Sequence, residues 1–193
     1  VIGMISRMVD QKGFDLIQEI LPQVLEEGAR FVILGTGQQE YEEYFRELSR
    51  EMPEKCGARV QYNERLAHLI VSGADMFLMP SRFEPSGLTQ LYSMRYGTLP
   101  IVRETGGLAD SVVDLNAGTA VKGTATGFRF ARYEPQALLD CIRRAIETYE
   151  DQPDVWKQLM TNSMNRDSSW TKAAEDYEQV YEQVTADSPT PTY

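Results

Sequence analysis

Two short apolar runs, 75–79 and 99–102, are each followed at once by polar residues that could bind a ligand. A loop with the carboxylate of Glu84 follows the first run, and a helical pattern begins just beyond it at Leu88. The turn 105–107 follows the second run and contains two glycines. Strand, loop, helix and strand in this order predict two neighbouring parallel strands. Both corners then lie at the carboxyl edge of a sheet, where open α/β folds bind ligands.

The first corner combines a carboxylate with backbone amides. Because Pro85 and Gly87 shape its loop, we expect Glu84 to point into a cleft rather than along a solvated helix face. The N–H groups of Gly87, Leu88 and Thr89 lie at a helix start, which is a natural site for phosphate oxygens.

The second corner offers a further approach to the same ligand. Gly106 and Gly107 allow the backbone to come close to it. A cleft with two amide-lined corners and one acid suits a phosphorylated sugar, with amides on the phosphates and the acid on the hydroxyls. An ordinary pair of β-α-β turns with one stray acid explains these residue types equally well.

Alternating strand and helix patterns along the chain predict an α/β fold that positions these corners. Apolar runs predict strands at 1–5, 30–34, 58–62, 75–79, 99–102 and 127–130. Amphipathic patterns predict helices at 15–27, 39–51, 66–72, 88–96, 134–149, 155–164 and 171–184. Pro22 is expected to disturb the first helix, and 116–126 is expected to be a surface loop.

Composition is that of one soluble domain. The 193 residues are 42% hydrophobic and 25% charged, and the net charge of -10 argues against nucleic acid as a partner. No apolar run approaches the length of a membrane span. Cys56 and Cys141 lack metal-site spacing and are expected to be free thiols in a reducing compartment. Arg7 and Lys12 follow the first strand, and each alone is typical of a solvated surface charge.

Five motifs in order resemble one protein family. They are I-S-R-M-V-D-Q-K-G-F-D-L from residue 5, V-I-L-G-T-G from 32, S-R-F-E-P-S-G-L-T-Q-L-Y from 81, Y-G-T-L-P-I-V-R-E-T-G-G-L-A-D from 96, and G-F-R-F from 127. They resemble the C-terminal domain of the bacterial glycogen synthases and plant starch synthases, glycosyltransferase family five. The likeness covers nearly the whole chain apart from its last few residues.

This resemblance implies a fold and a division of the chain. The expected fold is a three-layer Rossmann-like α/β domain with a mostly parallel six-stranded sheet, the C-terminal half of a GT-B glycosyltransferase. Residues 1–184 would form the nucleotide-sugar-binding domain and 185–193 a disordered tail. Val1 falls directly into a strand, which suggests a start at a domain boundary, and the family's N-terminal acceptor domain with its K-x-G-G-L loop is absent. We therefore expect nucleotide binding with negligible glucan elongation.

The resemblance also implies an activity, the transfer of glucose from ADP-glucose to the non-reducing end of an α-1,4-glucan with retention of configuration. Arg7 and Lys12 would bind the diphosphate, and Glu84 the glucose hydroxyls. Two fixed cations can stabilise the departing ADP without a metal ion, and no Asp-x-Asp metal motif or cofactor is expected. Further nucleotide-sugar contacts would come from Tyr62 on the adenine and from Ser86, Gly87, Leu88, Thr89, Thr105, Gly106 and Gly107.

Some alternatives stay open. One is a non-catalytic nucleotide- or glucan-binding module of the same fold. Another is a nicotinamide-dependent dehydrogenase, although Glu40 stands where a third glycine should follow Gly35 and Gly37. The sequence does not fix ADP over UDP, or starch over glycogen. The expected location is the cytoplasm for a bacterial source, and the plastid stroma or starch granule for a plant or algal one.

Overall fold

A six-stranded sheet forms the centre of the computed structural model, which describes residues 1–186. All strand pairs are parallel, and the strand order is β3-β2-β1-β4-β5-β6. The predicted sheet is thus confirmed. The strands are β1 (Ile2–Ile5), β2 (Phe31–Gly35), β3 (Cys56–Val60), β4 (Met76–Met79), β5 (Leu99–Arg103) and β6 (Phe128–Phe130).

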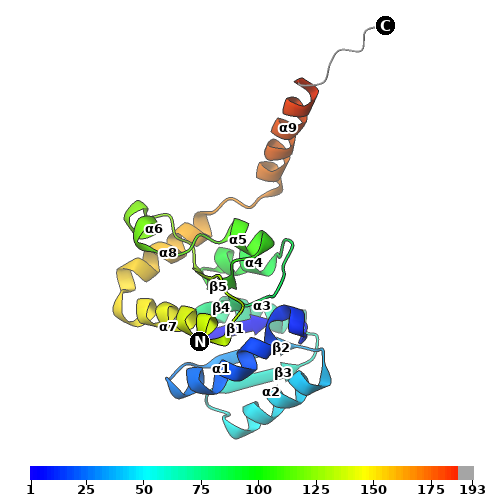
Figure 1. Ribbon diagram of the computed structural model, residues 1–193, viewed down its shortest axis with the longest axis vertical. Helices are drawn as coiled ribbons and strands as arrows, with labels where there is room; N and C mark the ends of the chain where they lie inside the picture. The colour runs from blue at the N-terminus through cyan, green and yellow to red at the C-terminus, as the bar shows by residue number, and fades with distance from the viewer. Residues whose placement is uncertain (187–193) are drawn as a thin grey trace.

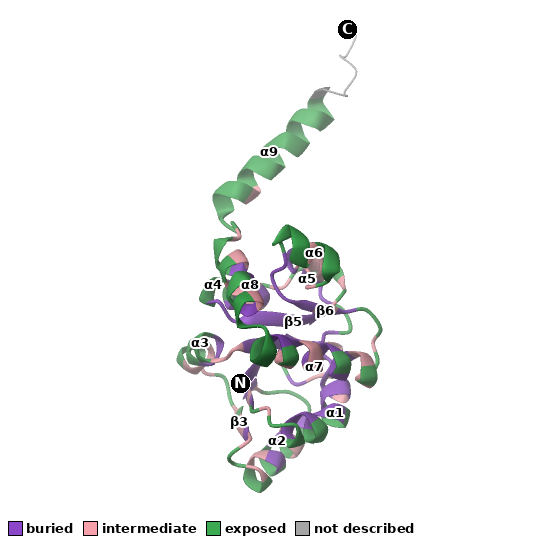
Figure 2. Cartoon of the chain, turned by 90° about the vertical axis from the view of Figure 1, so that its left-hand side faces the viewer, coloured by how far each residue is buried: buried purple, intermediate pink, exposed green. Residues whose placement is uncertain are grey.

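Helices cover both faces of this sheet (Figures 1 and 2). One face carries α1 (Phe14–Glu26), α2 (Gln39–Glu51) and α7 (Pro135–Asp151), and the other carries α3 (Glu64–Gly73), α4 (Thr89–Tyr96) and α5 (Gly106–Ser111). The central strands are apolar throughout because both their faces are covered. In β5, for example, Leu99, Ile101 and Val102 are fully buried. The remaining helices are the 3-10 turn η1 (Asp10–Lys12), α6 (Ala117–Lys122), α8 (Pro153–Asn165) and α9 (Trp170–Ala186).

Pro22 lies inside α1, yet the helix runs unbroken from Phe14 to Glu26. Proline has no N–H, so the carbonyl four residues earlier, that of Gln18, loses its helical donor. The Tyr44 hydroxyl donates to this carbonyl instead, at 3.3 Å. A side chain from α2 therefore replaces the missing helical hydrogen bond.

Three predicted elements differ in the structure. The turn expected at 105–107 leads into the short helix α5, which begins at Gly106. The loop expected at 116–126 contains the short helix α6, because the Asn116 side chain and the Thr119 side chain cap its first turn reciprocally. Six residues are too few for an apolar periodicity to be visible. The strand expected at 58–62 is β3, two residues earlier, so Tyr62 lies beyond its end.

The last helix, α9, extends away from the rest of the domain, and almost all of it is exposed (Figure 2). Apolar side chains on this helix are exposed as well, with Tyr177 at 67% and Val180 at 53%. The predicted tail begins at 185, whereas the helix continues through Ala186. The remaining residues of the predicted tail, 187–193, lie outside the part of the chain that the structure describes. Within residues 1–186, every helix is too short or too polar to cross a bilayer.

Candidate functional site

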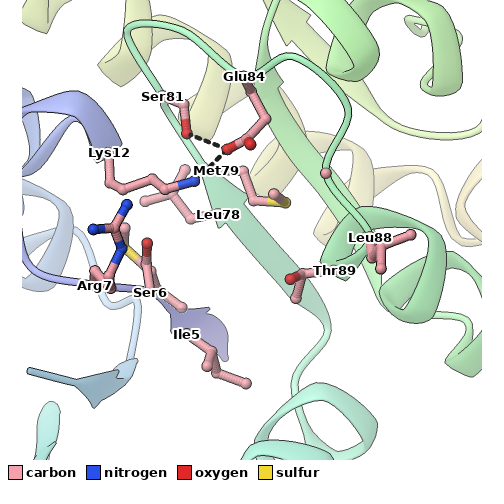
Figure 3. Close-up of a pocket in the computed structure, with 12 residues that line it drawn as sticks. Ile5, Ser6, Arg7, Lys12, Leu78, Met79, Ser81, Glu84, Leu88 and Thr89 are labelled. Atoms are coloured by element: carbon pink, nitrogen blue, oxygen red, sulfur yellow. Dashed lines mark hydrogen bonds and ion pairs between the residues drawn. The ribbon is translucent and has the colours of Figure 1, made fainter.

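A cavity of about 360 Å³ opens at the carboxyl edge of the sheet, between β1 and β4 (Figure 3). The strand order changes direction between these two strands, since β2 and β3 continue to one side and β5 and β6 to the other. Ligands of open α/β sheets bind at this topological switch point. Six predicted site residues line the cavity: Arg7, Lys12, Glu84, Gly87, Leu88 and Thr89.

An ion pair between Lys12 and Glu84 spans the cavity from the β1 side to the β4 side (Figure 3). The two side chains are mostly buried, at 19% and 11% exposure. The hydroxyl of Ser81 donates to the same carboxylate oxygen at 3.3 Å. Arg7 is exposed and forms no ion pair with any described residue. The ligand-free cavity therefore holds one neutralised cation and one uncompensated cation.

Two glycines, Gly35 and Gly37, allow close backbone contact with the loop that carries Arg7. A Cβ on Gly35 would lie 1.9 Å from the carbonyl oxygen of Ser6, and one on Gly37 would lie 2.1 Å from that of Met8. The amide of Met8 also donates to the Thr36 carbonyl at 2.9 Å. The G-T-G sequence is thus explained by contact between two backbone segments. Its glycines face the 6–8 loop, which disfavours the dinucleotide-binding interpretation.

The loops of Lys12 and Glu84 are joined to each other directly. The Arg82 amide donates to the Gln11 carbonyl at 2.8 Å, and the Gln11 side chain donates to the Phe83 carbonyl at 3.1 Å. Gly13 has a φ of 80°, and a Cβ there would lie 2.3 Å from the Pro80 carbonyl oxygen. This backbone contact fixes the distance between the two charged side chains.

Amides at the start of α4 are available to an anion. The N–H groups of Gly87, Leu88 and Thr89 donate to no acceptor in the described part of the chain. They face the same cavity as Lys12 and Arg7. This agrees with the free amides expected at this helix N-terminus, where the helix dipole also favours negative charge.

The Thr-Gly-Gly segment, residues 105–107, contacts the backbone of the Glu84 loop, and none of its three residues lines the cavity. The Gly107 amide donates to the Glu84 carbonyl at 3.0 Å, and a Cβ on Gly106 would lie 2.2 Å from that same oxygen. Thr105 and Gly106 line no described cavity. Gly107 and Ser86 line a second cleft of about 390 Å³, on the side of α9.

Tyr62 is 89% exposed and is not among the residues that line the cavity. It lies just beyond β3, two strands away from β1 in the sheet. The sequence interpretation missed the role of Ser81, which donates a hydrogen bond to Glu84, although its position two residues after the end of β4 was a usable signal. No group of three or more His, Cys, Asp or Glu side chains suited to a metal occurs among the described residues.

The two cysteines are buried, form no disulfide, and have thiols of altered pKa. Cys56 and Cys141 are free and buried, as expected. Loss of hydration raises the pKa of both thiols to about 11. Neither thiol lines the cavity, so they belong to the core of the domain.

Fold and cavity together define a doubly wound α/β domain whose switch point carries a cavity lined by two cations and one carboxylate. Residues 1–159 match the family described as "Glycosyl transferases group 1", and the chain belongs to this family.

Sequence relatives extend this assignment. The chain is 48% identical over 184 residues to a glycogen synthase of Kosmotoga olearia, which covers 95% of this chain and 38% of the relative. A glycogen synthase of Desulforudis audaxviator is 49% identical over 181 residues, covering 94% and 36%. The chain thus spans 36% to 38% of the length of these two relatives.

A solved structure shows the same fold at high similarity. It is the catalytic domain of starch synthase IV from Arabidopsis thaliana, bound to ADP and acarbose, with a TM-score of 0.85 and 36% identity over 94% of this chain and 38% of that one. Sucrose-phosphate synthase from Thermosynechococcus elongatus, with a TM-score of 0.69 at 22% identity over 97% of this chain and 46% of that one, shares the fold. The predicted resemblance to the C-terminal, GT-B half of glycogen and starch synthases is confirmed.

Proposed function

We propose that this chain is the nucleotide-sugar-binding half of a retaining glucosyltransferase that transfers glucose from ADP-glucose to the non-reducing end of an α-1,4-glucan. The observation that carries this proposal is one cavity at the switch point of the sheet that combines Arg7, Lys12 and Glu84 with free amides. The glycogen synthase relatives and the ADP-bound starch synthase structure support this substrate class.

The cations have a defined role in this reaction. Cleavage of the bond between the anomeric carbon and the phosphate oxygen leaves negative charge on ADP. Arg7 and Lys12 stabilise that charge, and the amides of Gly87, Leu88 and Thr89 bind further phosphate oxygens. All five groups are held on loops whose backbones contact one another, so little reorganisation is needed during the reaction. Lys12 has further N–H protons beside the one given to Glu84, and these remain available to phosphate.

Glu84 is proposed to accept hydrogen bonds from the glucose hydroxyls. Lys12 and Ser81 both contact the same carboxylate oxygen, so the other oxygen accepts no hydrogen bond from the described residues. Among the described residues, no second acid lines the cavity. Retention of configuration is therefore proposed to proceed by attack on the same face, with the departing diphosphate taking the proton of the acceptor hydroxyl.

The remaining contacts are proposed to complete the nucleotide site. Tyr62 would stack on the adenine, which its high exposure permits. Leu88 and Thr89 would contact the phosphate and the ribose, and Ser86 would contribute a further contact to the nucleotide sugar. Thr105, Gly106 and Gly107 would contact phosphate and sugar, and their hydrogen bond to the Glu84 loop brings this turn close to the site.

We propose that the complete reaction also needs an N-terminal acceptor domain, since the chain spans only 36% to 38% of the length of two glycogen synthase relatives. We propose that the glucan binds mainly to that N-terminal domain, and that the isolated chain elongates glucan at a negligible rate, because both acceptor contacts and domain closure are missing. The proposed location is the cytoplasm for a bacterial protein, and the plastid stroma or starch granule for a plant or algal one.

Calorimetry tests the binding half of this proposal. ADP, UDP and ADP-glucose are titrated into the unmodified chain, Lys12→Ala and the control Lys157→Ala, whose lysine is exposed on α8. We expect ADP and ADP-glucose to bind the unmodified chain and the control, and Lys12→Ala to weaken both by about tenfold or more. Unchanged affinity in Lys12→Ala would exclude this site. NAD binding in a thermal-shift comparison, without ADP binding, would favour a dehydrogenase.

A further inference from the structure

Arg103, the last residue of β5, connects two loops at the carboxyl edge of the sheet. Its Nε donates to the Ser81 carbonyl at 2.8 Å, and its guanidinium also donates to the carbonyl of Arg82. A third contact, at 3.4 Å, reaches the carbonyl of Ala131 after β6. Arg103 forms no ion pair with any residue in 1–186, so its whole donor fork is directed at backbone oxygens.

These carbonyls belong to the segment that carries Glu84. Between the end of β4 and the start of α4, the chain has no regular structure. No other donor in the described part of the chain reaches the carbonyls of Ser81 or Arg82. Ser81 in turn holds the Glu84 carboxylate through its hydroxyl. A continuous set of contacts therefore runs from Arg103 through Ser81 to Glu84.

An aromatic ring supports this arrangement from the β6 side. The guanidinium carbon of Arg82 lies 4.4 Å from the centroid of the Tyr133 ring, and that of Arg103 lies 5.7 Å from it. The hydroxyl of Tyr133 donates to Asp15, which also pairs with Arg82. Both arginines are thus held in place. Arg103 donates to the backbone carbonyls of Ser81 and Arg82, while the Gln11 side chain donates to that of Phe83.

We propose that Arg103 is a positioning residue for Glu84 in the binding of the sugar part of a nucleotide sugar. This inference rests on the proposed function, in which Glu84 binds the glucosyl hydroxyls while Arg7 and Lys12 bind the diphosphate. Arg103 lines no part of the cavity and touches neither cation. Its removal is therefore expected to loosen the Ser81 end of the Glu84 loop, while the contacts of Gln11 and Gly107 with this loop and the side chains of Arg7 and Lys12 remain.

The comparison of ADP with ADP-glucose separates positioning from a general structural role. The two ligands share the nucleotide and differ in the glucosyl group, which is the part that Glu84 would bind. We expect Arg103→Met to bind ADP within about twofold of the unmodified chain and ADP-glucose about tenfold more weakly, the loss expected for one misplaced charge-assisted hydrogen bond. Arg103→Lys keeps a charged donor but not the planar guanidinium, and its affinity for ADP-glucose is expected to fall less.

Arg132→Met is the matched control. This arginine lies near the same edge of the sheet, pairs with Glu134 and is 76% exposed at its side chain, so its removal changes the local charge equally. It is expected to change neither affinity. Equal weakening of ADP and ADP-glucose in Arg103→Met, or no weakening of either, would overturn the positioning role.

Glu84→Ala separates this inference from the proposed function. If Glu84→Ala selectively weakens the affinity for ADP-glucose and Arg103→Met does not, only the inference about Arg103 is overturned. No selective loss in Glu84→Ala overturns the assigned role of Glu84 and the inference with it. Circular dichroism verifies folding, and if Arg103→Met is unfolded, Arg103→Lys is judged by the same ratio of the two affinities.

Discussion

Removing Lys12 should destabilise the ligand-free domain, because it leaves the Glu84 carboxylate in the cavity with one hydrogen bond from Ser81. Glu84 is 8% exposed, so this carboxylate has little water to replace the lost partner. Breaking a buried pair costs about 3–5 kcal/mol and breaking an exposed one at most about 1 kcal/mol. Because the cavity is open to solvent, we expect a value between these, about 2 kcal/mol for Lys12→Met.

Glu84→Gln should cost less, about 1 kcal/mol, since Gln keeps the volume and Lys12 can turn toward water in the cavity. The double variant removes both charges and should also lose about 1 kcal/mol, which gives a coupling energy of about 2 kcal/mol. In a domain of this size, Lys12→Met alone corresponds to a fall of about 4–8 °C in the melting temperature.

Urea denaturation of the four proteins without ligand measures this cycle. The exposed pair Arg46–Glu42, four residues apart on α2, provides a control cycle with Arg46→Met and Glu42→Gln. Its coupling should not exceed about 0.5 kcal/mol. If the losses in Lys12→Met and Glu84→Gln simply add in the double variant, the two charges do not interact in solution and the reasoning fails.

Three further predictions concern the rest of the domain. The free energy of unfolding should fall from pH 9 to pH 11. Buried Cys56 and Cys141, with pKa values of about 11, stay protonated in the folded state, whereas the thiols of the unfolded chain, with pKa values near 9, ionise. Urea midpoints should fall less steeply with pH in a variant with both cysteines changed to alanine. Gly37→Ala should cost about 2 kcal/mol or more in thermal unfolding, since its Cβ would meet a carbonyl oxygen at 2.1 Å, whereas Gly73→Ala, with nothing within 4 Å, should not destabilise. Asp114→Asn should cost about 2 kcal/mol by the same measurement, because this carboxylate accepts two hydrogen bonds from one arginine side chain and one from a backbone amide.

The sequence predicted the parts of the fold that repeat a pattern. Continuous apolar runs marked the buried strands, and amphipathic spacing marked α1, α2 and α7. Features without such a pattern were missed. The helix α6 depends on a local cap at Asn116, and the end of β3 is set by pairing with β2, which placed Tyr62 outside the strand.

The candidate site shows the same division. Residue types and motifs identified Arg7, Lys12 and Glu84, and the structure brings all three into one cavity. The pairing of Lys12 with Glu84 could not be predicted, because it depends on how two loops 72 residues apart meet. The role predicted for Gly106, a close approach of its backbone to the ligand, was also incomplete, because Gly106 closely contacts the backbone carbonyl of Glu84.

The local charge of the cavity is compatible with the proposed binding of a diphosphate by an acidic chain. The chain has a net charge of -10, which would repel an anion at long range. Within the cavity, Glu84 neutralises Lys12 and leaves the charge of Arg7 uncompensated among the described residues. In the proposed function, a diphosphate would first meet one exposed cation and three free amides, and would then share Lys12 with Glu84. Because the ion pair already holds the Lys12 ammonium beside Glu84, this charge would lie within reach of both the phosphate and the sugar.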